Sequence, residues 1–123
     1  MIEISDEQFQ QLINEALDTL PKDRMEHVQN VAFLFEDEPT PEQRVKLELR
    51  RDQTLLGLYE GIPLARRQGM TNVFQPDKIT LFKLPLCAIA NSPEELKEQI
   101  RHTMWHELAH YFGLDHEQIH ELE

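Results

Sequence analysis

The sequence is poor in the residues that mark several common protein classes. It has one cysteine, Cys87, so no disulfide can form within the chain, and we expect a reducing, cytoplasmic environment. No apolar run approaches the roughly 20 residues that a membrane-spanning helix requires. The first residues, MIEISDEQFQQ, are acidic and lack the basic start and apolar stretch of a secretory signal. We therefore expect a cytoplasmic protein with no membrane partner.

Positive charge is also scarce. Lys and Arg number 12 against 23 Asp and Glu, which gives a formal net charge of −11. Nucleic acids and anionic membranes both bind through a basic surface, so this charge argues against either as a partner. The two short basic runs, at 49–51 and 65–67, have acidic neighbours and are interpreted as solvated surface.

The residues that are present describe one globular domain. The 123 residues are 40% hydrophobic and 28% charged, and no repeat or low-complexity linker divides them, so we expect a single domain over 1–123. Periodicity and turn signals predict an α+β fold, with helices flanking a small mixed sheet. The predicted elements are a capped helix at 5–20, a strand within 28–37, a turn at 38–44 followed by a helical stretch to about Arg51, a short strand before Glu60-Gly61, a strand at Ile79–Leu84 and a helix at 92–113.

The position of one predicted strand follows from a proline. Pro85 directly follows Ile79–Leu84, and proline cannot donate a hydrogen bond to a β ladder. We therefore expect this strand to lie at an edge of the sheet.

The last predicted helix has clear end signals. Ser92 is placed to cap its N-terminus, and Pro93 fits the first helical position. Glu94 and Glu95 then lie in the first turn, where the helix dipole favours negative charge. Gly113 is placed to adopt the left-handed conformation that ends a helix.

Five of the six histidines lie in the stretch HTMWHELAHYFGLDHEQIH, at 102–120. His106 and His110 are one helical turn apart, so their rings project from the same face and can share one metal ion. Glu107 completes the pattern H-E-x-x-H, in which the glutamate acts as general base on a metal-bound water. Gly113 allows a chain reversal that can return His116 as a third ligand. Three protein ligands with one open position indicate a catalytic zinc site.

The string H-E-x-x-H-x-x-G-x-x-H resembles the motif of the metzincin zinc peptidases, but no methionine follows His116 to form their Met-turn. The chain is more similar to a family of small bacterial zincin-like proteins, predicted metallopeptidases with a minimal zincin fold. This resemblance rests on FEDEP at 35–39, LLGLYEGIPL at 55–64, KITLFKLPL at 78–86 and SPEELKEQIRHTMWHELAHYFGLDHEQIHEL at 92–122. It implies an edge strand above the metal helix, for which Ile79–Leu84 is the expected segment, with a peptide substrate bound along it.

Several neighbouring residues have alternative roles. Asp115 could replace His116 as the third ligand, although the spacing favours His116. His102 and His120 could extend the imidazole row but are interpreted as residues outside the ligand set. The side chain of Cys87 is interpreted as a small apolar residue in the core. Tyr59 and Tyr111 could donate to an oxyanion, and nothing in the sequence places either one. Trp105 and Phe112 are interpreted as core residues.

The function that these residues favour is a zinc-dependent metallopeptidase with one Zn²⁺ per chain, held by His106, His110 and His116. A non-catalytic zinc- or peptide-binding module is the alternative. A second alternative is a three-histidine zinc hydrolase acting on RNA, similar to a bacterial ribosome-maturation endoribonuclease family with the spacing H-x3-H-x5-H. Glu107 and the net charge of −11 argue against that alternative. Imidazole sites also accept cobalt, nickel or copper.

Overall fold

The structure is a computed structural model that describes residues 1–28, 30–61 and 77–114. The predicted third ligand His116 and its neighbours Asp115 and His120 therefore lie outside the described residues, as does the basic run at 65–67. The described elements are α1 (Asp6–Asp18), α2 (Lys22–Met25), β1 (Val31–Glu36), α3 (Pro41–Lys46), β2 (Gly57–Glu60), β3 (Asp77–Phe82), α4 (Lys83–Ile89) and α5 (Pro93–Phe112).

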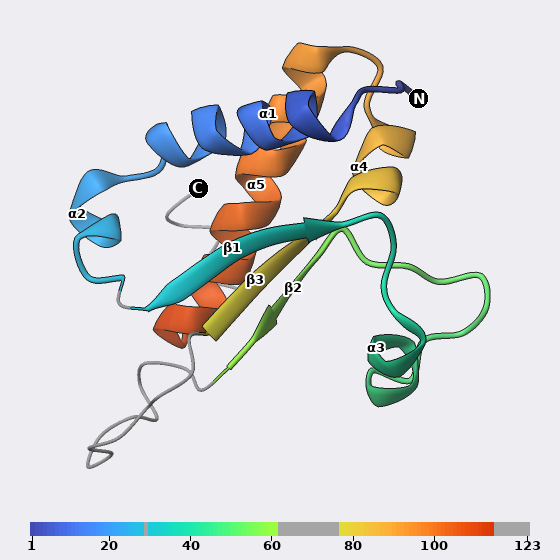
Figure 1. Ribbon diagram of the computed structural model, residues 1–123. Helices are drawn as coiled ribbons and strands as arrows, with labels where there is room; N and C mark the ends of the chain where they lie inside the picture. Colours follow the sequence, from blue (N-terminus) through green and yellow to red (C-terminus); the bar gives the residue numbers. More distant parts are fainter. Residues whose placement is uncertain (29, 62–76, 115–123) are drawn as a thin grey trace.

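The three strands form one mixed sheet in the order β1-β3-β2 (Figure 1). β1 pairs with β3 in parallel, with Phe33 opposite Ile79, and β2 pairs with β3 antiparallel, with Tyr59 opposite Ile79. The long helix α5 runs behind this sheet, and α1 crosses α5 (Figure 1). The predicted α+β class, with a small mixed sheet and a C-terminal helix, is confirmed.

The predicted edge position of Ile79–Leu84 is wrong, because β3 is the central strand and β1 and β2 are the edges. Pro85 does not belong to the strand. It lies in the first turn of α4, where a missing N–H costs no helical hydrogen bond. The strand itself ends at Phe82, and only Lys78 among its residues is exposed, as expected for a strand with neighbours on both sides.

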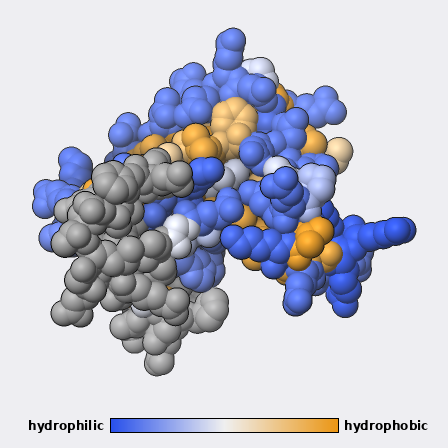
Figure 2. All heavy atoms as spheres, turned by 60° about the horizontal axis from the view of Figure 1, so that its bottom comes forward, coloured by the Kyte–Doolittle hydropathy of each residue, from blue (hydrophilic) through white to orange (hydrophobic). Residues whose placement is uncertain are grey.

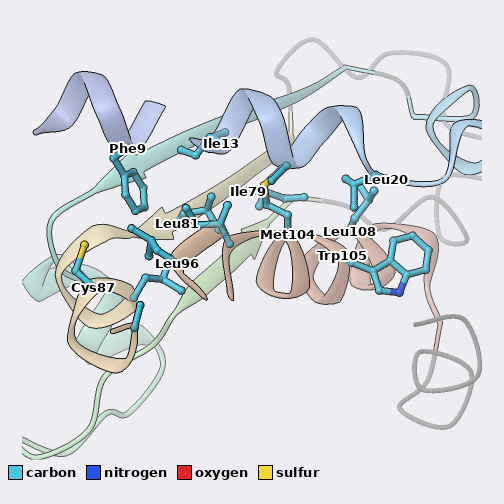
Figure 3. Packing of buried hydrophobic residues seen from close by; sticks show 14 of the residues in the cluster. Phe9, Ile13, Leu20, Ile79, Leu81, Cys87, Leu96, Met104, Trp105 and Leu108 are labelled. Atoms are coloured by element: carbon cyan, nitrogen blue, oxygen red, sulfur yellow. The ribbon is translucent and has the colours of Figure 1, made fainter. Parts of the chain in front are cut away.

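The core lies between the sheet and the helices α1 and α5. Its buried side chains are spaced at helical intervals on both helices and include Ile79 and Leu81 of β3. Figure 3 shows Phe9 and Ile13 of α1, and Leu20 just after this helix, pointing toward the side chains of the sheet and of α5. Each fully buried side chain of this size contributes roughly 1.5–3 kcal/mol relative to exposure. The buried residues of α5 are Leu96, Ile100, Thr103, Met104, Trp105, Leu108, Ala109 and Tyr111.

Local signals set the helix ends. The Ser5 hydroxyl accepts from the N–H of Gln8 at 3.1 Å, and the Gln8 side chain accepts from the N–H of Ser5 at 2.9 Å, so the predicted capping box is confirmed. The predicted helical stretch to Arg51 is too long, because α3 ends at Lys46 and Glu48 adopts a positive φ of 55°. A residue in that conformation cannot continue a right-handed helix.

The surface is polar with separate apolar residues. The face seen in Figure 2 is mostly hydrophilic, and its apolar side chains form small separate groups. No helix among the described residues is long and apolar enough to cross a membrane. The large apolar side chains that are exposed are Met1, Leu34, Val45, Leu47, Leu84 and Ile89.

The C-terminus of α5 ends in a Schellman motif. Gly113 adopts φ 76° and ψ 24°, its N–H donates to His110, and the N–H of Leu114 donates to the carbonyl of Ala109 at 3.0 Å. The predicted helix stop at Gly113 is therefore confirmed. It directs the chain away from the helix axis shortly after His110.

We expect Gly113→Ala to lower the free energy of unfolding by about 1 kcal/mol, because a Cβ disfavours the left-handed conformation. Gly113→Asn should cost less, since asparagine tolerates this region better. Urea denaturation of the three proteins measures the difference. Equal stability of the alanine variant and the wild type would mean that Gly113 is not left-handed in solution.

Candidate metal centre

One turn of α5 brings together three side chains that can hold a metal ion. The rings of His106 and His110 have centroids 5.4 Å apart and planes inclined by 77°. One potential ligand atom from each of His106, Glu107 and His110 lies within 4.8 Å of the others. His106 and Glu107 are half-buried, and this part of α5 lies against β2, at the edge of the sheet. The helical spacing read from the sequence therefore brings these groups together as predicted.

The donor set fits a zinc ion. Tetrahedral ligands about 2 Å from zinc lie roughly 3.4 Å from one another, so atoms within 4.8 Å need only small side-chain rotations to converge. Imidazole nitrogen is a preferred zinc ligand, and an adjacent carboxylate is the usual companion of a zinc-activated water. Two histidines alone leave such a site short of one protein ligand, which is the place assigned to His116.

Glu107 is tied to the sheet through a main-chain hydrogen bond. The N–H of Tyr59 in β2 donates to Oε1 of Glu107 at 3.0 Å. The carbonyl of Leu56 accepts a hydrogen bond from the N–H of Phe82, so the backbone groups of Leu56 face β3. Along an antiparallel strand only every second residue faces the partner in this way, so the backbone groups of Gly57 and Tyr59 face away from β3. The N–H of Tyr59 therefore points out of the sheet, and the carboxylate of Glu107 stands beside the outer edge of β2.

Burial changes the acidity of Glu107. Loss of hydration raises the pKa of this carboxyl above its ordinary value, while the nearby His110 and the hydrogen bond from Tyr59 act to lower it. A raised pKa brings a carboxylate closer to the range in which a general base works at neutral pH. The half-buried position thus suits the chemical role that the sequence pattern assigns to Glu107.

The close approach of β2 to α5 depends on Gly57. A Cβ placed on Gly57 would lie 2.6 Å from Cγ2 of Thr103 and 3.4 Å from Cγ of Glu107. Thr103 is only 5% exposed and β-branched, so its methyl group has little freedom to move. Neither Gly57 nor the N–H of Tyr59 was predicted from the sequence to belong to the site. A glycine inside a predicted strand was the available signal, because it often marks a close approach of the backbone.

A cleft opens beside Glu107, between the segment that enters β2 and the preceding turn of α5. Its volume is about 330 Å³. The cleft adjoins His106 and Glu107 on the flank away from His110. Its lining residues are Thr54, Leu55, Leu56, Gly57, His102, Thr103, His106 and Glu107.

Other residues considered in the sequence are placed as follows. The hydroxyl of Tyr59 donates to Oδ2 of Asp77 at 2.6 Å, so this hydroxyl is directed to β3. Tyr111 is fully buried and packs edge-on against the Tyr59 ring, with centroids 6.2 Å apart. Trp105 and Cys87 belong to the core, as predicted, and Phe112 packs against it. Burial raises the pKa of the Cys87 thiol.

The sequence that forms this site matches one protein family. The family described as zincin-like metallopeptidase matches residues 28–123, which is most of the chain. The chain belongs to the zincin-like metallopeptidase family. The family implies a metal, typically zinc, and among the described residues His106, Glu107 and His110 form a group that could bind it.

A solved structure is similar to this zincin in fold. It is a conserved hypothetical protein from Thermo thermophilus, with a TM-score of 0.56 and 22% sequence identity. The match covers 89% of the present chain and 94% of the other. At this identity the likeness shows the fold alone. No curated protein matches the chain.

We expect Gly57→Ala to lower the free energy of unfolding by roughly 1–3 kcal/mol, because the new methyl group overlaps Cγ2 of Thr103. Thr103→Ser removes that carbon and should restore much of the loss in the double variant. Denaturation of the wild type, the two single variants and the double variant gives the coupling free energy between the two positions. Additive effects, with no rescue, would show that the two residues are not in contact in solution.

Proposed function

We propose that this zincin hydrolyses peptide bonds, with one zinc ion held by His106, His110 and His116 and with Glu107 as general base. The observation that supports it best is the position of Glu107. Its carboxylate lies within 4.8 Å of the potential ligand atoms of both histidines, and the N–H of Tyr59 holds it at 3.0 Å. A glutamate with only a structural role has no need to be directed at two imidazoles.

The zinc ion and Glu107 would have different roles in the hydrolysis. The zinc ion, when bound, would supply a water of lowered pKa and would polarise the carbonyl of the scissile bond. Glu107 keeps Oε1 on the N–H of Tyr59, which leaves Oε2 to take a proton from the attacking water. The same oxygen can return this proton to the leaving amine. Because the main-chain N–H already holds Oε1 in place, less conformational entropy is lost when Oε2 is oriented toward the water.

The substrate would lie along β2 and not along β3. A peptide in extended conformation can add to a sheet edge through its backbone, and β2, which is half-buried, is the edge strand nearest α5. The N–H of Tyr59 on this edge is already bound by Glu107, so it would not bind the peptide. Because the carboxylate of Glu107 stands beside that edge, a peptide added there would pass over the turn that carries His106 and His110. This proposal replaces the expected binding along Ile79–Leu84, because that segment covers the end of the central strand β3 and the start of α4.

We expect Glu107→Gln to reduce turnover by about a hundredfold or more while zinc stays bound, because glutamine can accept the Tyr59 hydrogen bond but cannot act as a base. Zinc content and cleavage of a diverse peptide library by the wild type and the variant measure both effects. Surviving cleavage in the variant would exclude Glu107 as the base. No cleavage by a fully zinc-loaded wild type would favour a non-catalytic binding module.

We expect His116→Ala to weaken zinc binding strongly, because two imidazoles leave the site one ligand short. The matched control is His27→Ala, which removes an exposed histidine outside the site and should leave zinc affinity unchanged. Competition with a chelator measures the affinity, and thermal unfolding with and without zinc measures the linked stability. A variant that retains one tightly held zinc would transfer the third-ligand role to Asp115 or His120.

A further inference from the structure

The outer strand β1 leaves one edge of the sheet without a partner strand among the described elements. The strand order is β1-β3-β2, so β1 pairs with β3 on one side only (Figure 1). Helix α1 reaches β1 from the core face, where the rings of Phe9 and Phe35 have centroids 5.0 Å apart. The opposite edge differs, because α5 packs against β2 and Glu107 occupies the N–H of Tyr59. The uncovered edge is therefore that of β1.

This edge carries a regular row of main-chain donors and acceptors. The carbonyl of Asn30 accepts from the N–H of Asp77 at 3.0 Å, so the main-chain groups of every second residue from Asn30 onward face β3. The groups of Val31, Phe33 and Phe35 therefore point out of the sheet. Among the described residues, none of these three N–H and three C=O groups has a hydrogen-bond partner.

The side chains of β1 also favour a covered edge. Val31, Phe33 and Phe35 pack against the core but are only partly buried, and Leu34 on the other face is 45% exposed. Edge strands that stay unpaired in solution are usually protected by lysine, proline or a bulge. The run VAFLF at 31–35 has no charged residue and no proline. A strand with this composition favours pairing with another chain.

We propose that β1 is the contact surface of a homodimer, in which two copies pair antiparallel about Phe33 and join their sheets into one. In this register Phe33 lies opposite Phe33 of the second copy, and Val31 lies opposite Phe35. Each of these pairs exchanges both of its main-chain hydrogen bonds, so all the free groups of the edge are satisfied together. On the exposed face, Leu34 lies beside Ala32 of the second copy. The contact is on the edge away from Glu107, so it leaves β2 accessible.

The hydrogen-bonding pattern and the charges explain why the occupant is a second copy in this orientation. The row of free groups centred on Phe33 is its own complement under a two-fold rotation. The strand ends in the acidic run Glu36–Glu38, and a parallel alignment would place these like charges opposite one another, which destabilises a strand pair. The antiparallel register places them opposite the uncharged residues 28–30 of the second copy. The charged residues just before that segment balance one another: Lys22, Asp23, Arg24 and Glu26.

The size and the charge of the chain set the expected strength of this dimer. A contact made through one strand lies at the small end of interface sizes, so we expect a dissociation constant that is roughly micromolar. Each copy carries a formal net charge of −11, and this repulsion opposes association. Salt screens the repulsion, so the dimer should tighten when the ionic strength rises from about 0.02 M to about 0.5 M.

Sedimentation equilibrium of the full chain measures this association. Leu34→Glu places a carboxylate at the contact and should weaken the dimer roughly tenfold or more. The matched control is Leu84→Glu, which makes the same change at a leucine that is 48% exposed on α4 and should leave the dimer unchanged. Circular dichroism and thermal unfolding show whether each variant is folded.

Introduced cysteines test the register and remain informative if the glutamate variant does not fold. Leu34 and Ala32 of the second copy would form a pair without main-chain hydrogen bonds, whose Cα atoms lie about 4.5 Å apart. This separation suits a disulfide. Under mild oxidation, an equimolar mixture of Ala32→Cys and Leu34→Cys proteins should therefore form a cross-linked dimer faster than either protein alone. The wild type, whose Cys87 is buried, measures the background.

Three results would overturn the proposal. The first is a wild type that remains monomeric at roughly a hundredfold above the expected dissociation constant. The second is a dimer that Leu34→Glu does not weaken or that dissociates as salt is added. The third is a cysteine mixture that cross-links no faster than the single variants. A salt-strengthened dimer that depends on Leu34, with preferential cross-linking in the mixture, would support the antiparallel β1 contact.

Discussion

The contact between β2 and α5 is the constraint on which the rest of the site depends. The helix provides His106, His110 and Glu107, while the strand provides the N–H that fixes Glu107 at 3.0 Å. This contact is possible because Gly57 has no side chain to separate the strand from Thr103. On the other side of β2, pairing with β3 fixes the strand to the hydrophobic core, so the position of Glu107 is set by the packing of the whole sheet.

The partial burial of Glu107 has one unfavourable and one favourable effect. Burial raises the pKa of Glu107 and so disfavours its charged form, which costs stability at neutral pH. The same burial excludes water and strengthens electrostatic interactions with groups that approach it. His110 and the N–H of Tyr59 offset part of the cost, because both favour the ionised form. A site of this kind is stable only where the surrounding core is well packed, as it is along α5.

The sequence was most informative where structure depends on neighbouring residues. Helix α5, its cap at Ser92 and its stop at Gly113 could be predicted because capping and helical periodicity act over a few residues. The same periodicity was sufficient to bring the three side chains of the candidate metal centre together. Strand order could not be predicted in this way, because β1 and β3 pair across a long stretch of intervening sequence, with Val31 opposite Asp77. Pro85 was assigned to the end of a strand, although it is equally suited to the first turn of α4.

The hydrogen bond to Glu107 comes from the main chain, and this has a consequence for how the site can evolve. Every amino acid except proline supplies an N–H at position 59, so side chains along β2 can be exchanged without removing the donor. The side chains of β2 can therefore diverge between paralogues while the carboxylate of Glu107 keeps its main-chain donor. Gly57 has no such freedom, because its role depends on the absence of a side chain. The donor to Glu107 thus does not depend on which side chain position 59 carries, whereas the close approach at position 57 depends on having none.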